Sequence, residues 1–171
     1  MKQVVAVLVL SAPFAAFAAD DNPDAAFFKH AAEAGIAEVD AGQIAQDKAN
    51  SQALKDFGAR MVQDHGSVND KLKALAVSKN VTLPTSESVG EMATEAKLKV
   101  LSGDTFDKSY IKDQIKAHQQ AVGLFKKEAA SGRDPDVKAF AASTLPELQM
   151  HLKAIKAIAA DAGIQVAENK P

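Results

Sequence analysis

The chain has 171 residues, 47% of them hydrophobic and 25% charged, with a formal net charge of −2 and a pI of about 6.1. These values fit one soluble domain with a sizeable core, exclude a disordered chain, and give no electrostatic reason to expect a nucleic-acid partner. The chain has no cysteine, so any metal must be held by nitrogen and oxygen atoms.

The first 18 residues have the pattern of a secretory signal peptide. Lys2 is the lone basic residue, an apolar run spans Val4 to Leu10, and Ala16 and Ala18 form a small-x-small cleavage signal. The run is too short to cross a bilayer, and no later stretch supplies the roughly 20 apolar residues of a membrane helix. We therefore predict cleavage after Ala18 and an exported, periplasmic protein without a membrane span. An uncleaved N-terminal anchor is the alternative.

Capping and breaking residues indicate helices along the rest of the chain, and no alternating strand pattern is present. The predicted elements are a helix from Asn22-Pro23 to about Lys48, a helix capped by Ser51 that ends near Lys79, a loop over 80–88, a short helix within 87–102, a helix from Ser102 to Ala130, and a helix from Asp134-Pro135 to about Gly163.

This order of helices predicts an all-α fold. Two long hairpins joined by about two dozen residues fit a four-helix bundle with a long crossover connection. The crossover carries the short extra helix, and it is long enough to make the second and third long helices parallel. We expect the bundle to occupy residues 19–165 and the tail, residues 166–171, to be frayed.

Each long helix places one strongly polar residue on its apolar, core-facing stripe. These residues are Glu38, His65, His118 and His151, with Leu152 as an alternative inward position in the last helix. At 1.5 Å rise per residue they lie about 15 to 24 Å from their helix ends, which puts all four near mid-height of the bundle. We expect them to meet in the core.

One carboxylate and three imidazoles in an apolar interior point to a metal ion, because unpaired buried polar groups cost several kcal/mol. Nitrogen and carboxylate ligands suit zinc, iron, manganese or copper, whereas calcium and magnesium prefer more oxygen atoms. Glu38, His65, His118 and His151 make a complete four-ligand set for one divalent transition metal. A hydrogen-bonded Glu/His network that fixes the helix register is the alternative.

Three acidic residues are candidates for orienting these ligands from outside. Asp64 adjoins His65 but points about 100° away around the helix. Asp107 lies three turns before His118 on the same face and can also serve the start of its helix. Glu147 lies one turn before His151. We predict His30, near the edge of its stripe, to be a surface or interfacial residue.

Four stretches of the chain carry a family resemblance, namely "DAAFFKHAAEAGIAEVDAGQIA", "FGARMVQDH", "FDKSYIKDQIKAHQQAV" and "LPELQMHLKAI". They resemble the bacterial domain-of-unknown-function family 4142, a ferritin-like group of exported proteins, over nearly the whole chain after the leader. The most specific marks are Asp64-His65, Phe106-Asp107, His118, and Leu145-Pro146 with His151. The resemblance implies a ferritin-like four-helix bundle and no particular activity.

The chain departs from ferritin-like di-iron proteins, which use two Glu-x-x-His pairs. Val62 and Leu148 stand where those glutamates would precede His65 and His151. A mononuclear site or a polar core therefore fits better than a di-iron centre.

Three functions remain open from the sequence. The first is an exported metal-binding protein for storage, sensing or stress protection. The second is a metal-free envelope or stress protein that acts through its surface, and the third is a metal-dependent oxidoreductase. No phosphate loop, serine elbow or paired-carboxylate cleft is present, so we predict no catalytic residues.

Overall fold

The computed structural model describes residues 24–165, which form five α-helices and no strand. The helices are α1 (Ala25–Lys48), α2 (Gln52–Ser78), α3 (Val89–Val100), α4 (Gly103–Ser131) and α5 (Pro135–Asp161). The predicted signal peptide, the predicted helix start at Asn22-Pro23 and the predicted frayed tail lie outside these residues. Within them, no helix is both long and apolar enough to cross a membrane.

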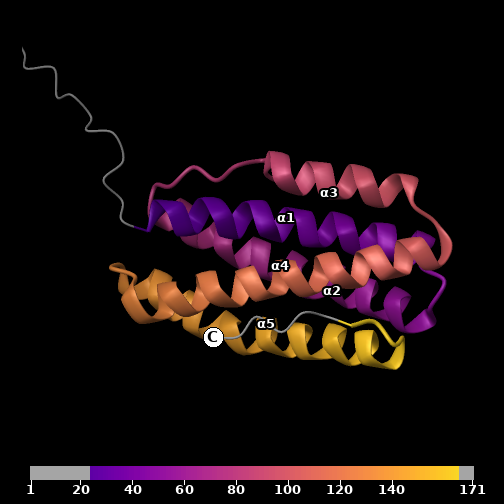
Figure 1. Cartoon of the computed structure of the whole chain (residues 1–171). Helices are drawn as coiled ribbons and strands as arrows, with labels where there is room; N and C mark the ends of the chain where they lie inside the picture. Colours follow the sequence, from indigo (N-terminus) through magenta and orange to yellow (C-terminus); the bar gives the residue numbers. More distant parts are fainter. Residues whose placement is uncertain (1–23, 166–171) are drawn as a thin grey trace, which may run out of the picture.

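The four long helices form a bundle of two hairpins (Figure 1). Helix α1 packs antiparallel to α2, and α4 packs antiparallel to α5. Between the hairpins, α1 contacts α4 and α2 contacts α5, so that α2 and α4 lie on a diagonal and run in the same direction. Helix α3 belongs to the crossover and lies on the outside, against α1 and α4. The predicted all-α bundle with a short helix in a long crossover is confirmed.

The core is divided into two apolar clusters by a polar layer. Toward one end lie, among others, Ala45, Leu54, Phe57, Met61, Phe106, Ile111, Ile115 and Ile155. Toward the other end lie Phe27, Phe28, Ala31, Leu72, Ala76, Phe125, Val137, Ala141 and Leu148. On each long helix, a buried glutamate or histidine stands between residues of the two clusters. The apolar stripes that hold the bundle together therefore also fix the height of its polar layer.

Two glycines bring α1 and α2 together beside this layer. A Cβ atom on Gly42 would lie 2.7 Å from the Gly58 carbonyl oxygen, and one on Gly58 would lie 2.6 Å from the Gly42 carbonyl oxygen. Both distances are shorter than a carbon–oxygen contact permits. Glycine is thus required on both helices, and Glu38 lies one turn from this crossing.

An aspartate from each hairpin holds the turn of the other hairpin. The Asp107 carboxylate accepts hydrogen bonds of 3.0 and 3.2 Å from the backbone N–H groups of residues 50–51, between α1 and α2. The Asp24 carboxylate accepts bonds of 3.0 and 2.9 Å from the backbone N–H groups of residues 133–134, between α4 and α5. These donors have no partner within a helix, so the carboxylates satisfy groups that their own hairpins leave open.

The helix caps differ in part from those expected. Ser51 and Ser102 are the N-cap residues of α2 and α4, but neither side chain makes a capping hydrogen bond. At α2, the Asp107 carboxylate accepts from the N–H groups of the two residues just before the helix, and not from its first turn. Asp134 caps α5 as predicted, and Ser88 and Glu91 form a capping box at α3.

Candidate metal site

Three histidines from three helices meet at mid-height of the bundle. His65 belongs to α2, His118 to α4 and His151 to α5, and their side chains are buried. Their ring centroids are 5.5 Å (His65 to His118), 5.4 Å (His65 to His151) and 5.5 Å (His118 to His151) apart. One ring nitrogen from each lies within 4.8 Å of the other two. The rings form a nearly equilateral triangle with a spacing suited to one shared ion.

Within residues 24–165, each of the three rings has a buried nitrogen without a hydrogen-bond partner. These atoms are Nε2 of His65, Nε2 of His118 and Nδ1 of His151. More than nine in ten buried polar groups in folded proteins are paired, so three unpaired nitrogens at one place need an explanation. A cation bound between the rings would satisfy all three at once.

In His118 and His151, the second ring nitrogen has a hydrogen-bond partner. Nδ1 of His118 lies 3.0 Å from the backbone oxygen of Gln114, and Nε2 of His151 lies 2.9 Å from Oδ2 of Asp64. A neutral imidazole that donates through one nitrogen carries its lone pair on the other. The lone pairs of His118 and His151 are therefore on the unpartnered nitrogens. Metal-binding histidines are commonly oriented in this way by a carbonyl or carboxylate.

Burial keeps the imidazoles of His65 and His151 neutral. Burial lowers the pKa of His65 to about 3, and the neighbouring His118 and His151 add to this shift. Burial also lowers the pKa of His151, against the hydrogen bond that its ring donates to Asp64, which raises this pKa. Metal binding requires the neutral form, so these two side chains are in the binding state at neutral pH.

Glu38, expected from the sequence to be the fourth ligand, lies behind His118. Its Oε1 is 3.6 Å from Nδ1 of His118, the nitrogen that faces Gln114, and its Oε2 accepts a 2.8 Å hydrogen bond from Nε2 of Gln114. Burial raises the pKa of Glu38, while His118 and Gln114 oppose the shift. The structure thus brings together three of the four expected ligands and places the carboxylate where it can orient His118.

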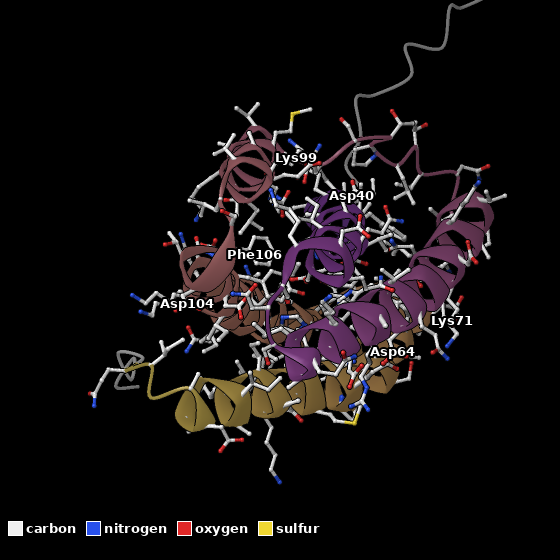
Figure 2. The ribbon with its side chains drawn as sticks, turned by 90° about the vertical axis from the view of Figure 1, so that its right-hand side faces the viewer. Asp40, Asp64, Lys71, Lys99, Asp104 and Phe106 are labelled. Carbon is white, nitrogen blue, oxygen red and sulfur yellow. The ribbon has the colours of Figure 1, made fainter. Side chains whose placement is uncertain are left out.

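Asp64 and Glu147 lie next to His151 on its outward side. One oxygen of each carboxylate and one nitrogen of His151 fall within 4.8 Å of one another. Figure 2 shows Asp64 where α2 faces α5. Burial and the Asp64 charge raise the pKa of Glu147, and Lys71 opposes them. Both acids are therefore positioned to act on His151.

Two other residues lie away from the histidines. Asp107 is about 16 Å along α4 from His118 by helix rise. Its carboxylate accepts from the turn between α1 and α2, and not from the start of its own helix α4, which the sequence had suggested. His30 has a side chain 59% exposed and lies 3.3 Å from Glu33. Its exposure fits the predicted surface position.

Gln114 is the member of the polar layer that sequence reasoning missed. It is buried in α4, its side chain donates to Glu38, and its own backbone oxygen lies 3.0 Å from Nδ1 of His118. Its Oε1 has no partner within residues 24–165. A signal was available in its position one turn before His118, where side chains share a helix face.

Comparison with known proteins gives a family and a fold. A sequence model for the family described as "Domain of unknown function (DUF4142)" matches residues 10–158. The structure is similar to that of a DUF305 fragment from Deinococcus radiodurans (TM-score 0.71, 12% identity), covering 81% of this chain and 95% of that chain. It is also similar to a "putative secreted protein DUF305" from Streptomyces coelicolor (TM-score 0.69, 13% identity), covering 88% and 100%. No curated protein matches the sequence. At such identities the likeness shows the helical fold alone.

Proposed function

The chain belongs to the DUF4142 family, and we propose that it is an exported protein that binds one divalent transition metal in its core. His65, His118 and His151 are the proposed ligands. The observation that carries the proposal is the triangle of three buried imidazoles, each with an unpartnered nitrogen.

A metal accounts for this layer better than a hydrogen-bonded network does. A network that only fixed the helix register would pair the imidazole nitrogens with neighbouring donors and acceptors. Here the outer nitrogens of His118 and His151 are paired, while the nitrogens that remain unpartnered belong to the three facing rings. Metal-binding histidines have the same arrangement, in which one ring nitrogen is hydrogen-bonded and the other binds the metal.

The ligand set narrows the choice of metal. Neutral imidazoles suit zinc, copper and iron and also accept manganese, whereas magnesium and calcium favour oxygen ligands. The proposed role of Glu38 is to support His118 through Gln114. A cation would then have three protein ligands, a number that leaves a coordination position for water or a small molecule.

The proposed biological role is metal storage, sensing or stress protection in the periplasm. The N-terminal pattern of residues 1–18, which favours export, supports this location. The name of the similar Streptomyces coelicolor protein, "putative secreted protein DUF305", agrees with export. A metal-dependent oxidoreductase is the second candidate, because three protein ligands leave room for a reacting molecule.

The test is metal content together with metal-dependent stability. Protein purified from the periplasmic fraction without chelators should contain one equivalent of metal by mass spectrometry. After chelation, titration with zinc, copper, iron(II) or manganese should raise the melting temperature, with about 2.7 kcal/mol of stabilisation when free metal exceeds its Kd a hundredfold. A metal-free protein whose melting curve none of these ions moves would overturn the proposal.

A further inference from the structure

The three histidines are shielded from solvent, so a cation must pass other side chains to reach them. Their exposed fractions are 5% for His65, 0% for His118 and 1% for His151. Two sides of the polar layer carry carboxylates that could receive a cation. One is the side of Asp64 and Glu147, and the other is a pocket beside Glu38.

The Asp64 side reaches a proposed ligand directly. The Asp64 side chain is 24% exposed, and Oδ2 of this carboxylate lies 2.9 Å from Nε2 of His151. Glu147, also half-buried, brings a second carboxylate oxygen within 4.8 Å of both. His151 therefore belongs to two groups of potential metal-binding side chains. Its Nε2 lies beside Asp64, and its Nδ1 is buried and has no partner within the described residues.

On the side of Glu38, a hydrogen bond blocks the way from the surface to His118. A pocket of about 300 Å³ lies between α1, α3 and α4 and is lined by acidic residues that include Glu91, Glu95 and Asp113. At its inner end Gln114 donates to Glu38 over 2.8 Å, and both side chains are buried. This pair separates the pocket from His118, whereas no side chain stands between Asp64 and His151.

We propose that Asp64 and Glu147, together with Nε2 of His151, form a capture site through which a divalent transition metal enters the three-histidine site. The inference rests on the proposed function. Two carboxylates and one imidazole are ligands that such cations accept. The position of the group at the half-exposed edge of α2 and α5 lets it receive a hydrated ion.

The two ring nitrogens of His151 allow a cation to pass from the capture site to the three-histidine site. A neutral imidazole carries one N–H and one lone pair, so His151 can offer a lone pair to the outer group or to the core group, but not to both. The ring keeps its single proton in both states. When a cation is bound outside at Nε2, the proton is on Nδ1; when the cation is bound inside at Nδ1, the proton is on Nε2 and the hydrogen bond to Asp64 forms again.

The experiment compares rates of uptake and release with the amount bound at equilibrium. Metal is first removed from the full-length mature protein with a chelator. The metal-free protein is then mixed with cobalt(II) at low ionic strength, and binding is followed by visible absorption in a stopped-flow instrument. Release is then started with excess chelator. Glu147→Gln is the test variant, and Glu95→Gln, an equal change of charge in the pocket beside Glu38, is the matched control.

A residue on the entry route of the metal affects the free-energy barrier for uptake and the barrier for release equally. Glu147→Gln should slow uptake and release alike by about tenfold, the lower end of the rate gains that charged clefts provide, and should leave the bound amount unchanged. Glu95→Gln should keep wild-type rates. Wild-type rates in Glu147→Gln, or equal slowing in both variants, would overturn the capture site. Wild-type protein that binds no cobalt would count instead against the proposed function.

Discussion

Nε2 of His151 lies 2.9 Å from Oδ2 of Asp64, and this contact determines which ring nitrogen faces the core. Asp64→Ala should therefore weaken metal binding by about 10- to 100-fold, the usual cost of losing a carboxylate that orients a histidine ligand. Competition with a chelator of known affinity measures the effect. Asp70→Ala, which removes an exposed acid from the same helix, is the control and should keep wild-type affinity. Equal affinities for both variants would contradict an orienting role for Asp64.

Removing a ligand should remove the metal. His65→Ala and His118→Ala should each reduce metal content sharply, because two imidazoles hold a divalent cation far less tightly than three. His30→Ala changes an exposed side chain and should retain the wild-type content. Metal is measured by mass spectrometry, and circular dichroism verifies that each variant is helical. A folded His65→Ala protein with full metal content would exclude His65 as a ligand.

The crossing of α1 and α2 should tolerate no side chain at Gly42. Gly42→Ala places a methyl group against the Gly58 carbonyl, and we expect a loss of about 1 to 3 kcal/mol in the free energy of unfolding. Gly123 in α4 has no atom within 4 Å of an added Cβ. Gly123→Ala should therefore stabilise the protein by about 0.5 to 1 kcal/mol, the helix preference of alanine. Urea denaturation of both variants gives the comparison.

The low pKa of His65 should make the metal-free protein acid-sensitive. Between pH 6.5, where histidine titrates in the unfolded chain, and about 3, where it titrates in the fold, the unfolded state holds a proton that the folded state lacks. The free energy of unfolding should then fall, through this group, by about 1.4 kcal/mol for each unit that the pH decreases.

A matched variant separates this effect from the other titrating groups. The raised pKa of Glu38 acts in the opposite direction, but it is common to wild type and to His65→Gln. In urea denaturation with a chelator at pH 7, 6 and 5, the loss of stability should be smaller in His65→Gln than in wild type. Parallel losses would show that His65 is not buried in the neutral form.

The sequence predicted the helices and the meeting of the histidines because both depend on simple periodicities. An apolar residue every three or four positions determines which face is buried, and the rise per residue determines the height at which His65, His118 and His151 lie. Neither depends on side-chain rotamers, so both could be derived without coordinates.

The orientation of Glu38 could not be derived in that way. Whether its carboxylate reaches the centre of the bundle or the back of His118 depends on the side-chain torsions and on the amide of Gln114. The caps show the same limit, since the carboxylate that serves the start of α2 comes from Asp107, 57 positions from Asn50 in the chain. Such long-range partners leave no local pattern to read.

The exchange of aspartates between the two hairpins makes each hairpin depend on the other for hydrogen bonds at its turn. Asp107 of the second hairpin accepts from the N–H groups before α2, and Asp24 of the first accepts from those before α5. The proposed metal ligands are divided in the same way, with His65 on the first hairpin and His118 and His151 on the second. Two copies of the chain that swapped hairpins through the long crossover would therefore rebuild every one of these contacts. The same bonds that join one molecule's halves would then join a dimer.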